Sequence, residues 1–340
     1  MQQKRKISID LGNGYVKVAF NGKVFMFRAA FREGIREDNS SEGYDVKFDG
    51  KDYVVGAGNT STTLISEKVT DISTLLYIVN AINIAFDSTQ YVDNVELTLG
   101  LPASYVATYR DTLKKFIIEN LTDKAVVFGD KRKVVSIADV KVGMQGAIFA
   151  TDIDAFANKK TLVMDVGAGT LDCLLFDNFK LIGEPLTLEV GMQKYWESLM
   201  VAINKSDDAI LAKSTKYTDY KDVENCVIRG EFIVNRKSYG LYEKDSPFAP
   251  IIDRTLKIHF DQQLNTIKST FATDTLHNII LTGGGASFLK KYFESKLGPC
   301  MLVNFSNTIV DMDNNELTKE QTQQFVNAIN YYKLSMMNDK

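Results

Sequence analysis

Residues 7–14 read Ile-Ser-Ile-Asp-Leu-Gly-Asn-Gly, and residues 162–169 read Leu-Val-Met-Asp-Val-Gly-Ala-Gly. Each stretch is an apolar strand that carries an aspartate and runs into a Gly-x-Gly turn, after which a second alternating strand follows. The two copies are offset by a constant 155 residues, which is too long for a solenoid repeat and fits a duplicated domain. The pattern therefore predicts two β-hairpins at equivalent places in two related domains.

A third glycine turn follows later in the chain. Residues 279–287 read Ile-Ile-Leu-Thr-Gly-Gly-Gly-Ala-Ser, which predicts a buried strand that ends at the glycines and a helix that begins after them. Elsewhere, segments with strand alternation take turns with segments of helical apolar period, as is typical of α/β proteins. Further strands are predicted at 23–28, 45–56, 94–101 and 124–137, a polar loop near 33–43, and helices at 70–87, 105–120, 192–204, 207–213, 220–230, 249–271 and 318–334.

The composition is that of an ordinary globular protein of two domains. The chain has 340 residues, of which 45% are apolar and 24% charged, and its net charge of −3 does not favour direct binding to nucleic acid. The three cysteines, Cys173, Cys226 and Cys300, have no spacing for zinc or for a disulfide framework. Since the sequence contains neither a secretory signal nor an apolar run long enough for a membrane span, we expect a cytosolic protein without a membrane partner.

The glycine turns predict a phosphate site. Glycine lets the backbone come close to an oxyanion, and consecutive N–H groups at such a turn bind phosphate. Asp10 and Asp165 stand at the two strand ends, where facing carboxylates suit a hydrated Mg²⁺ held through water. Lys17 lies on the return strand of the first hairpin and is a candidate phosphate ligand. The expected backbone ligands are Gly12, Asn13 and Gly14 in the first turn, and Gly167, Ala168 and Gly169 in the second.

The third turn, at Gly283, Gly284 and Gly285, has two interpretations from the residues alone. The following helix could bind an anion at its N-terminus, or the bare backbone could form a flat surface for a purine ring. The chain contains neither the Rossmann fingerprint, because no third glycine and helix follow the first two turns at the required spacing, nor a Walker A motif.

In this order, the three turns resemble the phosphate 1, phosphate 2 and adenosine motifs of the superfamily that includes actin, DnaK-type chaperones and hexokinase-like sugar kinases. The resemblance implies an actin-like ATPase fold, with two duplicated RNase H-like domains on either side of a nucleotide cleft that holds ATP, or GTP, with Mg²⁺. It implies a first domain at 1–152 with the last helix, 318–340, packed back on it, and a second domain at 153–317.

The resemblance also assigns roles to further residues. The second turn continues into Thr170 and Asp172, which match the bacterial form of the phosphate 2 motif. Gln145 lies on the segment that connects the domains, where the superfamily orients the attacking water with a glutamine or glutamate; together with Asp10 and Asp165 it is expected to be catalytic. Gly191 resembles the turn beside the ribose and phosphates, and Arg229 and Glu231 are candidates for the nucleotide clamp of the second domain.

Within the superfamily, the chain resembles the ParM/StbA-like plasmid-segregation actins. The segment 99–102, Leu-Gly-Leu-Pro, and the sequence of the last helix carry this likeness. It implies an ATPase of the bacterial cytosol that assembles head to tail with copies of itself into dynamic filaments, which move plasmid or phage DNA through a small DNA-binding adaptor on a centromere-like site.

Other members of the superfamily remain as alternatives. A small-molecule kinase would need a substrate-binding aspartate and a sugar site, for which the sequence offers no clear candidate. A non-polymerising regulator would share the same cleft. A DnaK-type chaperone would need a long C-terminal substrate domain, and the sequence ends directly after its last predicted helix.

Overall fold

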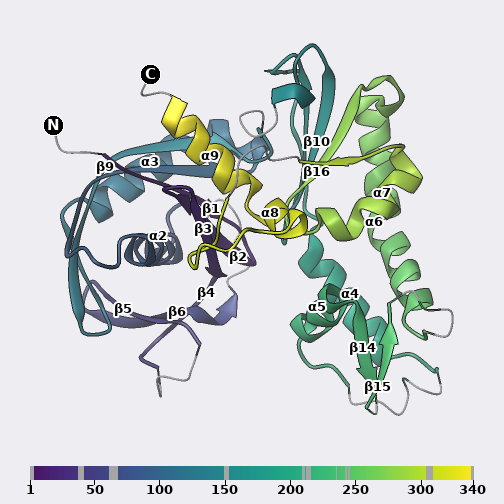
Figure 1. Cartoon of the computed structure of the whole chain (residues 1–340), viewed down its shortest axis with the longest axis horizontal. Coiled ribbons are helices and arrows are strands. Elements are labelled where there is room, and N and C mark those ends of the chain that lie inside the picture. Colours follow the sequence, from purple (N-terminus) through teal and green to yellow (C-terminus); the bar gives the residue numbers. More distant parts are fainter. Residues whose placement is uncertain are drawn as a thin grey trace.

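The computed structural model describes residues 4–36, 42–60, 68–148, 153–208, 211, 216–234, 236–241, 243, 246–303 and 309–337. The chain forms two lobes that lie side by side, with the last helices at their junction (Figure 1). Strands and helices alternate through both lobes, which confirms the predicted α/β class.

In the described part of the chain, the first lobe is built on one nine-stranded sheet in the order β3-β2-β1-β7-β9-β8-β5-β6-β4. β1 and β2 form the first predicted hairpin, and β1 also pairs in parallel with β7. The strands are β1 Arg5–Leu11, β2 Tyr15–Phe20, β3 Lys23–Arg28, β4 Ala30–Glu33, β5 Tyr44–Phe48, β6 Lys51–Thr60, β7 Tyr91–Leu101, β8 Lys124–Phe128 and β9 Lys131–Met144.

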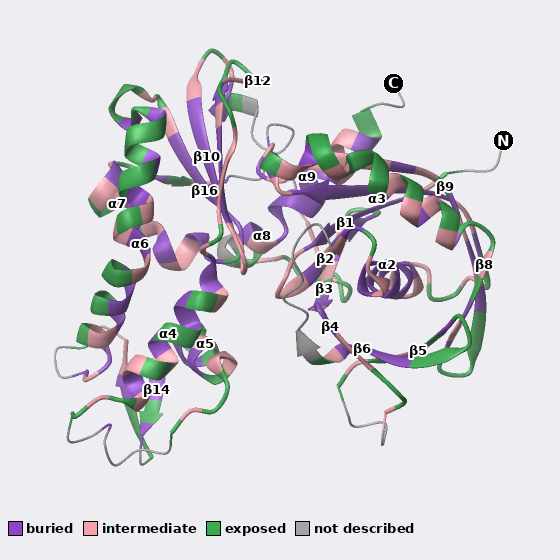
Figure 2. Cartoon of the chain, turned by 180° about the vertical axis from the view of Figure 1, so that it is seen from behind, coloured by how far each residue is buried: buried purple, intermediate pink, exposed green. Residues whose placement is uncertain are grey.

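This sheet curves around helix α2, Ile72–Ala85, which Figure 2 shows buried on most of its surface. Asp71 caps the N-terminus of α2 by accepting a hydrogen bond from the backbone N–H of Ser73 at 2.8 Å. The side chains of Ile7, Ile9 and Leu11 point from β1 into the same apolar core as α2. By the two-residue period of a strand, Ser8 and Asp10 then lie on the opposite face. The glycine turn after β1 is thus held on a rigid frame.

Several boundaries in the first lobe differ from the prediction. The expected strand 45–56 is divided by a turn at Asp49 and Gly50, both with positive φ. β4 ends at Glu33, where the polar loop was expected to begin. This unpredicted strand forms because its backbone pairs with β6 at the edge of the sheet. β9 extends beyond the expected 137 to Met144, paired along β7, so that Gln145 comes directly after a strand.

The second lobe repeats the pairing of the first. β10 and β11 form the second predicted hairpin, and β10 pairs in parallel with β16. A separate two-stranded sheet, β14 with β15, lies with α4 and α5 at the other end of the lobe (Figure 1). The elements are β10 Lys160–Val166, β11 Leu171–Asp177, β12 Lys180–Leu181, β13 Leu186–Leu188, α4 Met192–Asn204, α5 Tyr220–Arg229, β14 Glu231–Val234, β15 Lys237–Gly240, α6 Ala249–Phe271, β16 Asn278–Thr282, α7 Ala286–Leu297 and β17 Met301–Leu302. Most of the helix predicted at 207–213 lies outside the described residues.

The last predicted helix is two helices, α8 Lys319–Gln324 and α9 Val326–Met337, which meet at Phe325. α8 begins with a capping box between Thr318 and Gln321. α9 lies outside the curved sheet, next to α3, Val106–Leu121 (Figures 1 and 2). It packs against β1, β2 and β7, with Ala328 and Ile329 in an apolar cluster with Ala19 of β2.

Two glycines allow α9 to approach the sheet. A Cβ at Gly100 would lie 1.9 Å from the hydroxyl of Tyr331, and one at Gly143 would lie 3.4 Å from the same ring. Tyr331 is 1% exposed, so it has little room to move.

Gly100→Ala is therefore expected to lower the free energy of unfolding by about 1–3 kcal/mol, the usual cost of overpacking a core. Denaturant unfolding measures this change. The Tyr331 hydroxyl has no hydrogen-bond partner within the described ranges, so Tyr331→Phe should restore part of the loss in the double variant. Equal stability of Gly100→Ala and the natural chain would contradict this packing.

No helix within the described ranges is long and apolar enough to cross a membrane.

Candidate functional site

One cavity of about 440 Å³ lies between the two lobes and is lined by all three glycine turns. The lining includes both hairpin turns and the aspartates before them, together with Gln145. Of the predicted site residues, those on the cavity wall are Asp10, Gly12, Asn13, Gly14, Lys17, Gln145, Asp165, Gly167, Ala168, Gly169, Thr170, Asp172, Gly284 and Gly285. The fold thus brings together residues that are far apart in the sequence.

The first turn gathers a carboxylate, an ammonium and an amide. Asp10 is 2% exposed and accepts a hydrogen bond from Gln145 Nε2 at 2.9 Å through one oxygen. Its other oxygen lies 3.3 Å from Lys17 Nζ. The backbone N–H of Gln145 bonds to the carbonyl of Leu101 at 2.9 Å, which fixes Gln145 at the end of β9.

The second turn holds another buried carboxylate. Asp165 is 5% exposed and accepts a hydrogen bond from Asn327 Nδ2 of α9 at 2.6 Å. Burial raises the pKa of Asp165 to about 6; the bond from Asn327 opposes this effect, and the nearby charge of Asp10 adds to it. Asp10 and Asp165 are therefore close enough to interact across the junction of the lobes.

Asp172 stabilises the second hairpin through hydrogen bonds with two threonine hydroxyls. Its carboxylate is 2% exposed and accepts hydrogen bonds from Thr170 Oγ1 at 2.9 Å and from Thr187 Oγ1 at 2.5 Å. Burial raises the pKa of Asp172 to about 7, although these two hydroxyls favour its charged form. Thr170 and Asp172 thus hold the shape of the turn in addition to lining the cavity.

The first and second turns touch each other. A Cβ at Gly169 would lie 2.1 Å from Asn13 Nδ2, and a Cβ at Gly14 would lie 3.2 Å from the side chain of Ala168. Only glycine at position 169 leaves space for Asn13. The Asn13 side chain consequently spans the gap between the two turns.

The third turn lines the cavity through Gly284 and Gly285. Gly283 has φ of +88° and turns the chain beside Asp165, so it lies behind the cavity wall rather than on it. At Gly284 a Cβ would meet nothing within 4 Å, so the backbone there is open to the cavity. The rings of Phe288 and Trp196 pack at 5.1 Å between centroids next to this open backbone.

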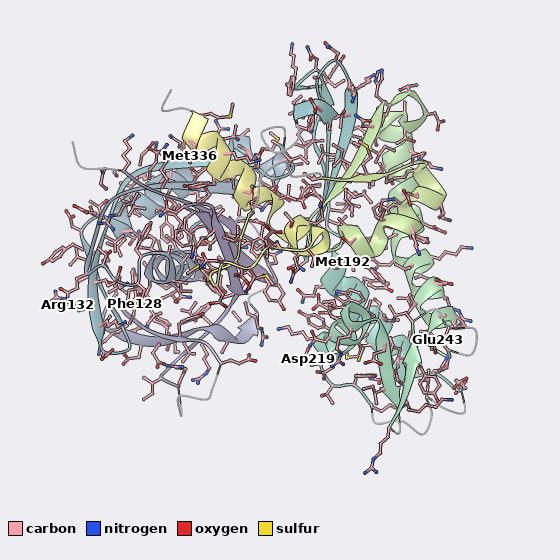
Figure 3. All side chains as sticks on the ribbon, in the orientation of Figure 1. Phe128, Arg132, Met192, Asp219, Glu243 and Met336 are labelled. Carbon is pink, nitrogen blue, oxygen red and sulfur yellow. The ribbon has the colours of Figure 1, made fainter. Side chains whose placement is uncertain are left out.

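Gly191 also supports the site from behind. It precedes α4, and a Cβ there would lie 2.1 Å from the carbonyl oxygen of Ala168. The following N–H groups of Met192 and Gln193 bond to the carbonyls of Gly167 and Ala168 at 3.0 and 2.9 Å. Figure 3 shows Met192 at the junction of the lobes, where α4 meets the second turn. The N-terminus of α4 thus fixes the second turn.

The predicted clamp residues Arg229 and Glu231 do not line the cavity. Arg229 is the exposed last residue of α5, and Glu231 bonds to Ser238 across the β14–β15 hairpin. The charged residues of α5 that do line the cavity are Lys221 and Glu224, about two turns earlier in the helix. Burial raises the pKa of Glu224, and Lys221 partly opposes this effect. Figure 3 places Asp219, the N-cap of α5, on the edge of the second lobe that faces the first.

Two further residues of the site carried no sequence motif. Asn327 donates to Asp165 and accepts from the backbone N–H of Gly146 at 3.0 Å, so α9 holds both the second turn and the connecting segment. Lys68, just before α2, bonds to the carbonyl of Leu11 at 2.5 Å and to Asn13 Oδ1 at 3.0 Å. Contacts this distant in sequence could be found only from the fold.

Two carboxylates in the cavity, Asp10 and Asp165, fit a hydrated Mg²⁺. Such an ion needs only one or two carboxylates, because waters and phosphates complete its shell. Asp10 and Asp165 are buried carboxylates that interact with each other. No group of three or more acidic, histidine or cysteine side chains among the described residues forms a metal site of its own. The arrangement therefore suits an ion that arrives with a phosphate ligand.

Comparison with known proteins agrees with this geometry. Residues 8–147 match the family model described as the actin-like proteins N-terminal domain. No curated protein matches the sequence. An archaeal actin homologue, Ta0583, in complex with ADP is 18% identical, with a TM-score of 0.71 over 98% of this chain and 99% of that chain.

Two filament structures are also similar. The subunit of a 15-stranded ParM filament from Clostridium botulinum is 17% identical, with a TM-score of 0.72 over 99% of this chain and 100% of that chain. The subunit of the Alp12 filament is 18% identical, with a TM-score of 0.66 over 99% of both chains. The chain therefore has an actin-like fold, as the resemblance of its three glycine turns implies.

Proposed function

We propose that this chain is an ATPase of the cytosol that assembles head to tail into dynamic filaments, and that these filaments segregate plasmid or phage DNA. The observation that carries the proposal is the pair of Asp–x–Gly-x-Gly turns facing each other in one cavity, with Gln145 bonded to Asp10. An ADP complex and two filaments among proteins of the same fold support it. We assign residues 1–152 and the last helix to a first domain, and residues 153–317 to a second.

The phosphate chain of ATP would lie between the first two turns, whose backbone N–H groups and Lys17 offer donors to its oxygens. Asp10 and Asp165 would hold Mg²⁺ through water, and the ion would neutralise charge on the phosphates. Gln145 has no useful basicity, so it would orient the attacking water rather than remove its proton. Its bond to Asp10 keeps the amide at the carboxylate end of the cavity.

The base and ribose would lie beside the third glycine turn. The open backbone at Gly284 and the ring of Phe288 offer a surface for a purine, while Lys221 and Glu224 approach from α5. A nucleotide that contacts both lobes favours the arrangement in which they are close, and only such differential contacts shift a conformational equilibrium. This shift would couple the bound nucleotide to the surfaces that meet in a filament.

DNA would be attached through a small adaptor protein, since the chain is mildly acidic and has no DNA-reading motif. Sedimentation, light scattering and electron microscopy at micromolar protein with Mg²⁺ and ATP, GTP or a non-hydrolysable analogue test the proposal. Filaments that form with triphosphate and shorten as it is consumed are expected. A chain that stays monomeric with every nucleotide, or that phosphorylates a small molecule, would contradict it.

The charged residues of α5 that line the cavity give a direct prediction. Glu224→Ala should weaken nucleotide binding by about tenfold, the effect of losing one hydrogen bond to a charged group. Glu231→Ala is the matched control and should leave the affinity unchanged, because Glu231 lies outside the cavity. Trp196 is the only tryptophan and lines the cavity, so its fluorescence can report binding. Equal effects of the two variants would show that α5 does not contact the nucleotide.

A further inference from the structure

Lys68 brings a second ammonium group to the first glycine turn. Its backbone carbonyl accepts a hydrogen bond from Thr74 Oγ1 at 2.7 Å, which ties the residue to the start of α2. Its side chain lines the cavity, and its ammonium donates to the backbone oxygen of Leu11 and to the amide oxygen of Asn13. An ammonium has three donors, and these contacts use two of them.

Two charged groups act on the ammonium of Lys68. Asp10 and Lys17 are the charged groups that act on it: Asp10 attracts its charge and Lys17 repels it. Burial lowers the pKa of Lys68 to about 8, because the charged ammonium is poorly compensated. Lys17 and Lys68 thus both interact with the carboxylate of Asp10, and an anion placed beside the turn would stabilise both ammonium groups.

The present partner of Lys68 occupies the space that an anion would need. Asn13 reaches across to Gly169, so its side chain fills the gap between the two turns. A phosphate chain that entered this gap would displace the Asn13 side chain, and Lys68 would then lose its contact with Asn13 Oδ1. A phosphate oxygen is the natural replacement, since its charge makes a stronger bond with an ammonium than a neutral amide does.

We propose that Lys68 binds the terminal phosphate of the nucleotide, exchanging the Asn13 amide oxygen for a phosphate oxygen. The inference rests on the proposed nucleotide function. The terminal phosphate is the one concerned because Lys68 interacts with Asp10, the carboxylate to which Lys17 and Gln145 are also bonded. Gln145 is the residue proposed to orient the water that attacks the terminal phosphate. Lys68 is then a direct ligand of the substrate, supplied by the segment that leads into α2.

The experiment compares Lys68→Met, Lys68→Gln and Lys68→Arg with the natural chain. Affinities for a non-hydrolysable ATP analogue, ADP and AMP are measured on the full chain by Trp196 fluorescence, below the concentration at which it assembles. Lys68→Met and Lys68→Gln should lose about tenfold more affinity for the triphosphate than for AMP, as expected for one charge-assisted bond. Lys68→Arg should recover part of this difference.

Lys133→Met is the matched control. Lys133 is a buried lysine whose ammonium bonds to the carbonyls of Asn83, Phe86 and Asp87 at the far end of α2. Its loss should lower stability without changing the ratio of triphosphate to AMP affinity. If Lys68→Met does not fold, Lys68→Gln decides the question, because it keeps a donor at the same place.

The outcomes separate the inference from the proposed function. If the natural chain binds no nucleotide, the proposed function fails. If the natural chain binds and the folded Lys68 variants lose affinity equally for all three nucleotides, or lose none, the inference is overturned and the proposed function stands.

Discussion

Replacing Gln145 by alanine is expected to slow nucleotide hydrolysis by about 100-fold while the nucleotide stays bound, an effect within the range for losing a group that directs proton transfer or water. Gln145 donates to Asp10 at 2.9 Å, and its backbone is bonded to Leu101. The backbone bond does not depend on the side chain, so Gln145→Ala should keep the end of β9 in place and remove only the amide.

Phosphate release in single-turnover conditions measures this effect, and the same protein's nucleotide affinity is the internal control. If filaments form, those of Gln145→Ala should persist longer once ATP is limited. Equal rates of phosphate release in the variant and the natural chain would mean that another residue orients the attacking water.

Asp165→Ala should lower Mg²⁺-dependent hydrolysis by at least tenfold in a protein that remains folded. The carboxylate is expected to orient the waters of the ion, and alanine cannot. The fold should tolerate the change, because burial raises the pKa of Asp165 to about 6. A carboxyl whose pKa is higher in the folded state than in the unfolded state destabilises the fold at neutral pH, so removing it costs no charge stabilisation.

The matched control for this variant is Asp177→Ala. Asp177 ends the same hairpin at the opposite end of the strands and is exposed, so its loss should change neither turnover nor Mg²⁺ dependence. Turnover at the natural rate in folded Asp165→Ala would contradict the assignment of Asp165 to the metal.

The parts of the fold that follow from local sequence could be predicted. Each Asp–x–Gly-x-Gly hairpin is a short-range pattern, and the strands at 94–101 and before the third glycine turn were also predicted. The equivalent pairing of β1 with β7 and of β10 with β16 agrees with the duplication inferred from residues 7–14 and 162–169. The strand that was missed, β4, forms because β6 offers its edge, which is a tertiary effect.

The site was predicted less completely, for a similar reason. Gln145 and the glycine turns carry motifs, but Lys68 and Asn327 have no pattern of their own and reach the turns only through α2 and α9. For the clamp, a signal did exist: Val223 and Val227 give α5 a buried face, and Glu224 lies beside it on the helix. Arg229 and Glu231 were preferred for their charge alone, and the end of α5 carries them away from the cavity.

The position of α9 also has a consequence for how the protein is made. The face of β1 and β2 that carries Ala19 is covered by Ala328 and Ile329, which leave the ribosome about 300 residues later. At roughly 5–20 residues per second, that face stays uncovered for roughly 15–60 s of translation. The first lobe therefore cannot reach its final packing while the second is being synthesised, and the nascent chain carries an unfinished sheet that is open to chaperones or to wrong pairing. Ribosome-bound chains stalled before Val326 should be cut by protease within the first lobe, whereas the released chain should resist.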